Sequence, residues 1–356
     1  AIGFTKEIGS SKPSARCGAR PLVWLAIGPF LFLQMVVFQN VARVAVLTSW
    51  PLPWAFGWTL LTQVAALGAC VWVLNKKDHH ILWPLALVCG IVLIAVTALS
   101  YPQTVWLAAT ALLVGQMCLS LLIVLVLIGV SDRIGRVGVA SVSTVFGFSM
   151  ILFLVLVLGY YAVYLVHLPY HNTILEPIAA SLVASCALVS CTSRLQSVRA
   201  GHKAWFVLGL TVVLLVLPLA GVLSWQEPSA TVQDGFPVRI MTYNLHNGFN
   251  TEGTLDIEAV ARVIEDNHPD ILALQEISRG WLVTGRLDML TWLSQRLNMS
   301  YISGPTADPF WGSAIFSRYP IVQYENRELP SRGLAVRRGF ISAVMDLGGG
   351  ENLQVI

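Results

Sequence analysis

Long apolar runs fill the first two thirds of the chain. Seven segments are long and apolar enough to cross about 30 Å of hydrocarbon, near residues 22–47, 54–74, 81–99, 105–130, 139–166, 174–192 and 204–224. The first run is too long for the apolar part of a cleavable signal peptide, and further spans follow it. The pattern predicts a short tail, residues 1–21, and then a polytopic α-helical membrane region with about seven transmembrane helices over residues 22–224.

The pattern changes after a polar linker, residues 225–237, which contains two prolines. Residues 238–245 alternate as a strand does, and residues 271–274 form a short apolar run that is typical of a buried strand. Amphipathic helices are predicted over two segments, 256–267 and 286–298. Further strands are predicted near 299–303, 312–317, 320–325 and 337–347, and a glycine-rich hairpin turn at 348–352 leads into a last strand. This order of elements predicts a layered α/β (α+β) domain over residues 238–356.

The connections between the spans alternate in charge. The N-terminal tail and the connections 75–80, 131–136 and 193–203 together contain 11 Lys and Arg residues, whereas 48–53, 100–104 and 167–173 contain none. Cytoplasmic loops carry the excess of basic residues in membrane proteins. The sequence therefore predicts a cytoplasmic N-terminus and, after seven crossings, an extracytoplasmic C-terminal domain. That domain would lie outside the plasma membrane of a bacterium, or on the lumenal side of the ER and Golgi in a eukaryote.

Composition excludes a purely soluble enzyme, because 56% of the residues are hydrophobic and only 12% are charged. Residues 227–356 carry 10 basic and 15 acidic residues. Tight binding to nucleic acid needs clustered Lys and Arg, so this balance argues against a nucleic-acid partner. The expected partners are the bilayer and a membrane lipid or a lipid-linked phosphodiester substrate.

Two charged residues fall within or beside predicted spans. Arg43 lies about one turn from the outer end of the first span, where its side chain is expected to extend to the interface. Glu176 is expected to cap the start of the span 174–192. Tyrosines gather at the outer end of the span 139–166 and predict an interfacial aromatic belt: Tyr160, Tyr161, Tyr164 and Tyr170.

Polar residues end the first two predicted strands of the C-terminal domain. Asn244 ends the first strand, and Glu276 follows the second. Strand ends present side chains to a cleft, and carboxylate and amide oxygens are ligands for a hard cation such as Mg²⁺. Such residues are also common as caps and turn residues, and on composition alone the structural interpretation is the stronger one.

Three motifs change that balance: Met241-Thr-Tyr-Asn-Leu245, Asp270-Ile-Leu-Ala-Leu-Gln-Glu276 and Gly312-Ser-Ala-Ile-Phe-Ser-Arg-Tyr-Pro-Ile321. In this order and spacing they resemble the opening motifs of the endonuclease/exonuclease/phosphatase (DNase-I-like) superfamily. The resemblance implies a two-sheet sandwich flanked by helices, and hydrolysis of phosphoester bonds that depends on Mg²⁺ (or Mn²⁺).

The resemblance also implies roles for single residues. It makes Glu276 the metal ligand and places the amide of Asn244 near the metal and the phosphate, so both are candidate catalytic residues. Ser313 stands where the superfamily often has Asn, and is a candidate substrate-binding residue. Arg318 is a second one, although it is equally expected to brace the turn that follows it.

A narrower resemblance comes from the order of the parts. Many spans followed by an outward-facing domain of this kind resemble the membrane proteins that exchange the lipid of glycosylphosphatidylinositol (GPI) anchors for ceramide, and their bacterial relatives. Motifs that carry this resemblance are Asn247-Gly-Phe249, Arg279-Gly-Trp281, Gly304-Pro-Thr-Ala-Asp308 and Arg337-Arg-Gly-Phe340. The resemblance implies a phosphodiester in a lipid headgroup as the substrate.

The superfamily's later motifs, which supply the base for the attacking water and a histidine, do not occur before Ile356. We therefore expect this chain to be the N-terminal part of such a domain, and this fragment alone to be inactive. Two alternatives stay open: a nuclease or phosphatase whose spans are only an anchor, and a membrane scaffold whose domain has lost catalysis.

Overall fold

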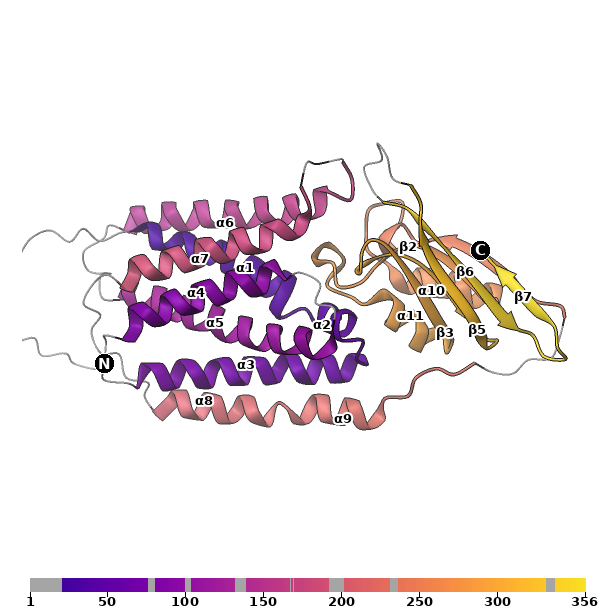
Figure 1. The fold of residues 1–356 in the computed structure, drawn as a ribbon, viewed down its shortest axis with the longest axis horizontal. Coiled ribbons are helices and arrows are strands. Elements are labelled where there is room, and N and C mark those ends of the chain that lie inside the picture. Colours follow the sequence, from indigo (N-terminus) through magenta and orange to yellow (C-terminus); the bar gives the residue numbers. More distant parts are fainter. Residues whose placement is uncertain are drawn as a thin grey trace, which may run out of the picture.

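In the computed structural model, a helical bundle and a β-rich domain lie end to end along the long axis (Figure 1). The structure describes residues 21–75, 81–99, 104–131, 139–166, 168, 170–191, 202–230, 236–330 and 337–356. The bundle contains a 3-10 helix, η1 (Pro21–Ala26), a π-helix, η2 (Gln34–Phe38), a second 3-10 turn, η4 (Asn172–Ile174), and the α-helices α1 (Ile27–Leu33), α2 (Val41–Thr48), α3 (Leu52–Leu74), α4 (Leu82–Ala98), α5 (Val105–Ser131), α6 (Val139–Ala162), α7 (Leu175–Cys191), α8 (His202–Val213) and α9 (Val216–Ser224).

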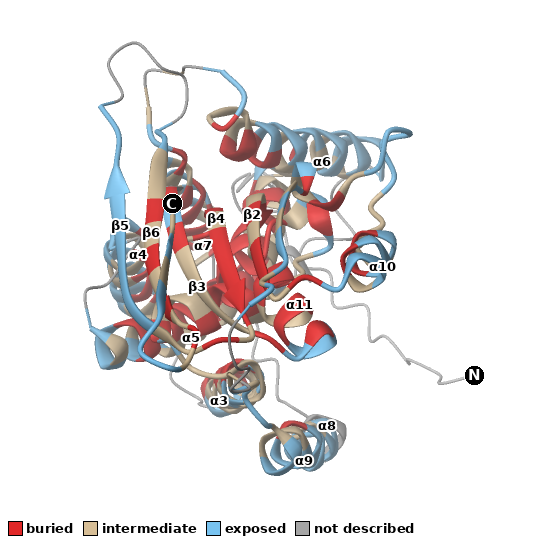
Figure 2. Cartoon of the chain, turned by 90° about the vertical axis from the view of Figure 1, so that its right-hand side faces the viewer, coloured by how far each residue is buried: buried red, intermediate tan, exposed pale blue. Residues whose placement is uncertain are grey.

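The length and composition of these helices suggest that the chain is a multi-pass membrane protein. Among the described residues, six helical segments are long and apolar enough to span a bilayer: Pro21–Phe38, Leu52–Leu74, Val105–Gly129, Val139–Ala162, Asn172–Cys191 and Trp205–Ser224. The helix α4 is apolar but has 17 residues. The outward faces of α6, α8 and α9 are exposed (Figure 2) although they are apolar, as contact with lipid tails requires.

The prediction of one continuous span over residues 22–47 is wrong. The helix that starts at Pro21 ends at Phe38, and α2 begins separately at Val41. The Asn40 side chain caps α2 by accepting a hydrogen bond from the backbone N–H of Arg43, at 3.1 Å. As a result α2 lies at the end of the bundle that faces the β-rich domain (Figure 1), which we call the domain end.

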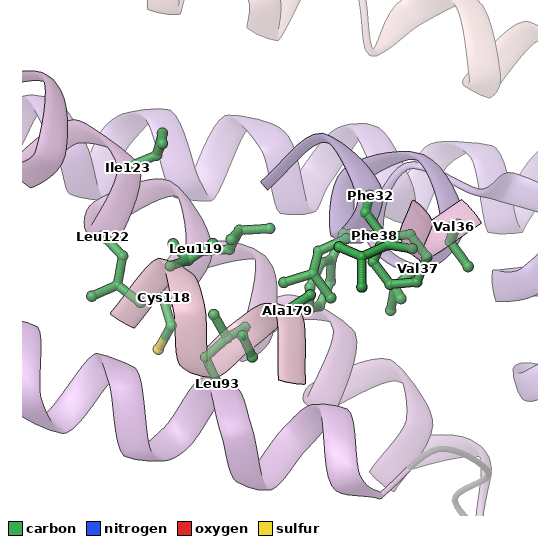
Figure 3. Packing of buried hydrophobic residues seen from close by; sticks show 14 of the residues in the cluster. Phe32, Val36, Val37, Phe38, Leu93, Cys118, Leu119, Leu122, Ile123 and Ala179 are labelled. Atoms are coloured by element: carbon green, nitrogen blue, oxygen red, sulfur yellow. The ribbon is translucent and has the colours of Figure 1, made fainter. Parts of the chain in front are cut away.

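The bundle packs around α5, which contacts α3, α4 and α7. Apolar side chains of different sizes fill its interior (Figure 3). Among them, Phe32, Leu93, Leu119 and Ala179 are fully buried. The basic connections that predict the orientation lie almost entirely outside the described residues. The C-terminal ends of α3, α5 and α7, which come directly before three of these connections, lie at the end of the bundle away from the domain (Figure 1).

The C-terminal region contains two small sheets. The first is mixed, in the order β1-β2-β4-β3, and the second is antiparallel, in the order β5-β6-β7. The strands are β1 (Ile240–Asn244), β2 (Ile271–Ser278), β3 (Ser300–Asp308), β4 (Trp311–Ser317), β5 (Ile321–Glu328), β6 (Gly339–Asp346) and β7 (Asn352–Val355), with short 3-10 turns η5 (His246–Gly248) and η6 (Leu282–Thr284). The predicted glycine hairpin between β6 and β7 is confirmed by a bond from the N–H of Leu347 to the carbonyl of Glu351, at 2.9 Å.

Two apolar layers position the first sheet. One face packs against α10 (Ile257–Asn267) and α11 (Met289–Leu297) through side chains such as Leu272, Leu274 and Phe316. The other face packs on the second sheet through Ile271, Ile315 and Met345. Both helices begin at a capping aspartate, since Asp256 accepts from the N–H of Ala259 and Asp288 from the N–H of Thr291. The α11 cap puts the start of that helix at Met289, three residues later than predicted. The result is a helix layer and two sheets, as a layered α/β (α+β) domain requires.

Candidate functional site

The register of β1 and β2 brings Asn244 and Glu276 to one edge. The two strands are parallel, and Asn244 lies opposite Gln275, so Glu276 follows one residue beyond. Because the carboxyl ends of parallel strands meet at the same edge of a sheet, the predicted pair shares this edge. Asn244 is exposed, and Glu276 is partly exposed.

Glu276 lies in a β-bulge, which determines its backbone conformation. The register of β2 against β4 shifts between Leu274 and Ile277, and Glu276 has a left-handed backbone with φ 55°. This conformation costs a residue with a side chain about 1–2 kcal/mol. Within the described part of the chain, the Glu276 carboxylate accepts no hydrogen bond and forms no ion pair. The fold thus holds an unpaired carboxylate on a strained backbone at a strand end, and bulges of this kind occur next to active sites.

Ser313 completes a row across three strands. On β4, Ala314 lies opposite Leu274 and Gly312 opposite Ile277, so Ser313 faces the bulge that contains Glu276. Asn244, Glu276 and Ser313 therefore lie at neighbouring positions on β1, β2 and β4. We call this row the Glu276 edge.

Arg318 does not join this edge. It follows β4 at the end where Ser317 pairs with Ile271, the first residue of β2. Its Nε donates to the carbonyl of Pro269 at 3.3 Å, and its N–H donates to the carbonyl of Asp270. Arg318 therefore braces the turn before β2, whereas the sequence suggested the turn that follows Arg318.

The chemistry of the edge suits part of a hard-cation site. The carboxylate of Glu276 is unpaired, while the amide oxygen of Asn244 accepts one bond, from the N–H of His246 at 2.8 Å. A carbonyl oxygen has two lone pairs, so one remains available. Among the residues that the structure describes, no cluster of three or more His, Cys, Asp or Glu could hold a metal. Mg²⁺ is commonly bound through one or two carboxylates, with water and substrate phosphate as the other ligands. Glu276 and Asn244 fit that minimal set, and a cation held there would neutralise charge on a transferring phosphoryl group.

A loop and an aromatic ring lie beside the edge. The loop after β1 has left-handed backbones at His246 and Asn247, and the Asn247 amide oxygen accepts a bond from Trp311 Nε1 at 3.0 Å. The guanidinium of Arg338 lies over the Trp311 ring, 5.6 Å from its centroid. Arg338 is exposed, so this cation is available to an anionic substrate. The signal for His246 and Asn247 was their position directly after the strand end of Asn244.

The loops next to this edge dock on the bundle. Trp281 follows β2, Trp311 begins β4, and both belong to the same buried cluster as the bundle interior. The Trp281 and Trp311 rings are stacked, with centroids 6.5 Å apart, and the Tyr164 ring lies 4.4 Å from Trp281. Tyr161 and Tyr164 are therefore buried against the domain, and Tyr160 is buried within the bundle beside Phe32 and Arg43. These positions correct the assignment of the three tyrosines to an interfacial belt.

Polar contacts accompany these rings. The Asn40 side chain donates to the carbonyl of Gly280 at 2.6 Å, and the Tyr161 hydroxyl accepts from the N–H of Leu282 at 2.7 Å. The Tyr164 hydroxyl donates to Asp308 and accepts from the Asn172 side chain, at 3.1 Å. Every one of these bonds joins the bundle to the two loops beside the Glu276 edge, or supports a side chain that does so.

The loop after β2 approaches α2 most closely at Gly280. It has a left-handed backbone, and a Cβ there would lie 2.6 Å from Asn40 Oδ1 and 2.9 Å from Ala42 Cβ. We expect Gly280→Ala to destabilise the docked protein by about 1–3 kcal/mol beyond the backbone cost, because two packed atoms must move. Gly285→Ala is the matched control, since Gly285 is also left-handed but nothing lies within 4 Å. Thermal unfolding in detergent measures both, and equal losses for the two variants would contradict the contact.

Asp308 is expected to make the stability of the docked protein depend on pH. Burial raises the pKa of Asp308 to about 7, against the backbone N–H groups of Phe310 and Trp311 and the positive charge of Arg43, which lower it. An acid whose folded pKa is raised contributes stability that is complete below its unfolded pKa, about 4, and is lost as the pH rises through the folded value. We expect the unfolding temperature to fall between pH 4 and pH 7, and Asp308→Asn to flatten that slope. Asp266→Asn, at an exposed position of α10, controls for general charge effects and should leave the slope unchanged.

The fold and the edge define a class: a layered α/β domain that presents a carboxylate and an amide at adjacent strand ends. Residues 241–346 match the Endonuclease/Exonuclease/phosphatase family. The match places a domain of the Endonuclease/Exonuclease/phosphatase type at residues 241–346.

A solved structure that is similar to part of this chain is an endonuclease/exonuclease/phosphatase from Beutenbergia cavernae DSM 12333. It shares 22% identity with a TM-score of 0.28, and the match covers 33% of this chain. The matched part spans 36% of that protein.

Proposed function

We propose that this protein is a metal-dependent phosphodiesterase that acts on lipid headgroups at the membrane surface, with Glu276 and Asn244 as catalytic residues and metal ligands and Ser313 as a substrate contact. One observation carries the proposal: the loops that dock on the bundle are those that flank the Glu276 edge. A soluble substrate does not require its active site to be fixed at the end of a membrane bundle. A lipid headgroup does, because it stays within a few ångströms of the bilayer.

The orientation is part of the proposal. The charge alternation favours a cytoplasmic N-terminus. The helix ends beside three of the basic connections lie away from the domain, which agrees with that orientation. The domain would then act on the extracytoplasmic leaflet. Protease added to intact cells or spheroplasts should degrade residues 238–356 and spare an N-terminal tag, whereas a protected domain would contradict this orientation.

The test uses the complete gene product in nanodiscs, so that the bundle and the domain are both present. With Mg²⁺, we expect headgroup release from phosphatidylinositol or sphingomyelin, loss of that release in EDTA, and much slower hydrolysis of bis(4-nitrophenyl) phosphate, which is soluble. Cleavage of oligonucleotides without lipid turnover would favour an anchored nuclease. Turnover of no substrate would favour a scaffold. Exchange of lipid on a GPI-type anchor stays a prediction from motif resemblance.

A further inference from the structure

Two cavities meet at the domain end of the bundle. The first has a volume of about 390 Å³ and lies between α2, the start of α3, the segment after α9, and the α11 and β3 side of the domain. The second, about 650 Å³, lies between α3, the start of α5 and α9. Trp50 and Pro51 line both of them, so the two cavities are neighbours across one short segment.

The two cavities differ in chemistry. The second is lined almost entirely by apolar atoms, with the rings of Trp54, Trp58 and Trp106 along its wall. The Trp58 ring is fixed by a bond from its Nε1 to the carbonyl of Ala109, at 3.1 Å. Tryptophan is enriched at the boundary between hydrocarbon and headgroups, so this cavity opens at the depth of the upper part of the lipid tails.

The first cavity is polar. Hydroxyl groups of Ser49, Thr291 and Ser303 line it. Trp225 also lies in its wall, and the Nε1 of this ring is buried and has no hydrogen-bond partner in the part of the chain that the structure describes. A buried donor without an acceptor is costly, and an anionic oxygen in this cavity would satisfy it.

Charge in the first cavity favours a zwitterionic group. Arg279 lines it, but the bidentate pair of Arg279 with Asp288, at 2.9 and 2.7 Å, neutralises that cation. Glu227 also lines the cavity and forms no ion pair with a described residue. A phosphate beside Trp225 and an ammonium beside Glu227 would match both features.

We propose that these two cavities together bind one diacyl phospholipid with a zwitterionic headgroup, its tails in the tryptophan-lined cavity and its headgroup in the polar one. This site is separate from the Glu276 edge, because none of Asn244, Glu276 and Ser313 lines either cavity. The lipid would bridge α3 and α9 to the α11 side of the domain, opposite to the docking contacts of Tyr164. This lipid would be a structural component of the protein and would not be the substrate at the Glu276 edge.

The test reconstitutes the full protein in nanodiscs with equal amounts of phosphatidylethanolamine and phosphatidylglycerol, extracts it into mild detergent, and counts retained lipid by native mass spectrometry. We expect one phosphatidylethanolamine per protein. Trp225→Phe, which removes only the Nε1 donor, and Leu61→Trp, which fills the apolar cavity from its rim, should each lose most of that lipid. Glu227→Gln should lower the preference for phosphatidylethanolamine by about two- to fivefold.

The control is Trp83→Ala, which removes an exposed ring at the start of α4, at the other end of the bundle. It should retain the lipid. The proposal is overturned if the retained lipids mirror the bulk mixture, or if Trp225→Phe and Leu61→Trp retain as much as the unaltered protein. Retention of a sterol or of detergent in place of phospholipid would also overturn it. An unchanged unfolding temperature in lipid-free detergent shows that loss of lipid in a variant does not reflect misfolding.

Discussion

Replacing Glu276 with glutamine is expected to lower phosphoesterase activity by at least about a hundredfold, the scale seen when one group that stabilises a transition state is removed. The physical reason is that the amide has the same shape but no charge, and its oxygen is a poorer ligand for a divalent cation. The measurement is headgroup release by the complete gene product with saturating Mg²⁺. The matched control is Glu351→Gln, at an exposed residue of the hairpin between β6 and β7, which should retain full activity.

The backbone conformation of Glu276 leads to a second, independent prediction, which concerns stability. Its φ of 55° suits glycine better than any residue with a Cβ. Glu276→Gly should therefore be more stable than Glu276→Gln by about 1 kcal/mol, although both are inactive. A fold that holds a carboxylate where glycine is preferred exchanges stability for function. If the glutamine variant keeps its activity, or the glycine variant is the less stable of the two, Glu276 is a turn residue only.

The sequence located Asn244 and Glu276 at strand ends. Alternation located the strand of Asn244, and a short apolar run located the strand before Glu276. The structure adds that these two strands are parallel neighbours, with an amphipathic helix between them in the chain. The bulge was not predictable, because the register shift at Gln275 and Glu276 depends on how β4 pairs with β2. Nor was the position of Ser313 opposite that bulge, since only the pairing of distant segments sets it.

Local sequence patterns also did not predict the contacts between the helical bundle and the β-rich domain. A tyrosine at the end of a span and a tryptophan in a loop each have common local explanations, and nothing near Tyr164 in sequence indicates Trp281 as its partner. The break at Asn40 had a signal, because asparagine is a preferred N-cap. The apolar residues on both sides of it made a single span the stronger interpretation. Arg318 illustrates the opposite case, since its motif is compatible with a phosphate contact but the fold puts it at the far end of β4.

Arg43 and Glu176 form a buried ion pair that the sequence patterns did not predict. They were expected at the interface and at a helix start, but the structure buries both and pairs them, with 3% and 1% of their side chains exposed. Arg43 Nη1 and Nη2 donate to the two carboxylate oxygens of Glu176 at 2.8 and 3.1 Å. The guanidinium also lies over the ring of Phe310, 5.2 Å from its centroid. One ion pair thus joins α2, α7 and the turn between β3 and β4.

Removing one partner of this pair leaves the other charge buried, so Arg43→Met should destabilise the protein by about 3–5 kcal/mol. The double variant Arg43→Met/Glu176→Leu removes both charges and should recover most of that loss, since apolar replacements of buried pairs are often neutral. Thermal and denaturant unfolding of both variants in detergent gives the comparison. A loss under about 1 kcal/mol in Arg43→Met, the value of an exposed pair, would show that water reaches the two groups.

The same variants separate stability from docking. Because Arg43 contacts Phe310, Arg43→Met should also loosen the turn that leads into Trp311 and lower activity although the Glu276 edge is intact. If the double variant regains stability but not activity, the cation acts through its contact with Phe310 and positions the domain. If it regains both, the pair is needed only because each charge requires the other, and the aromatic contacts of Tyr164 with Trp281 are sufficient to hold the Glu276 edge at the membrane.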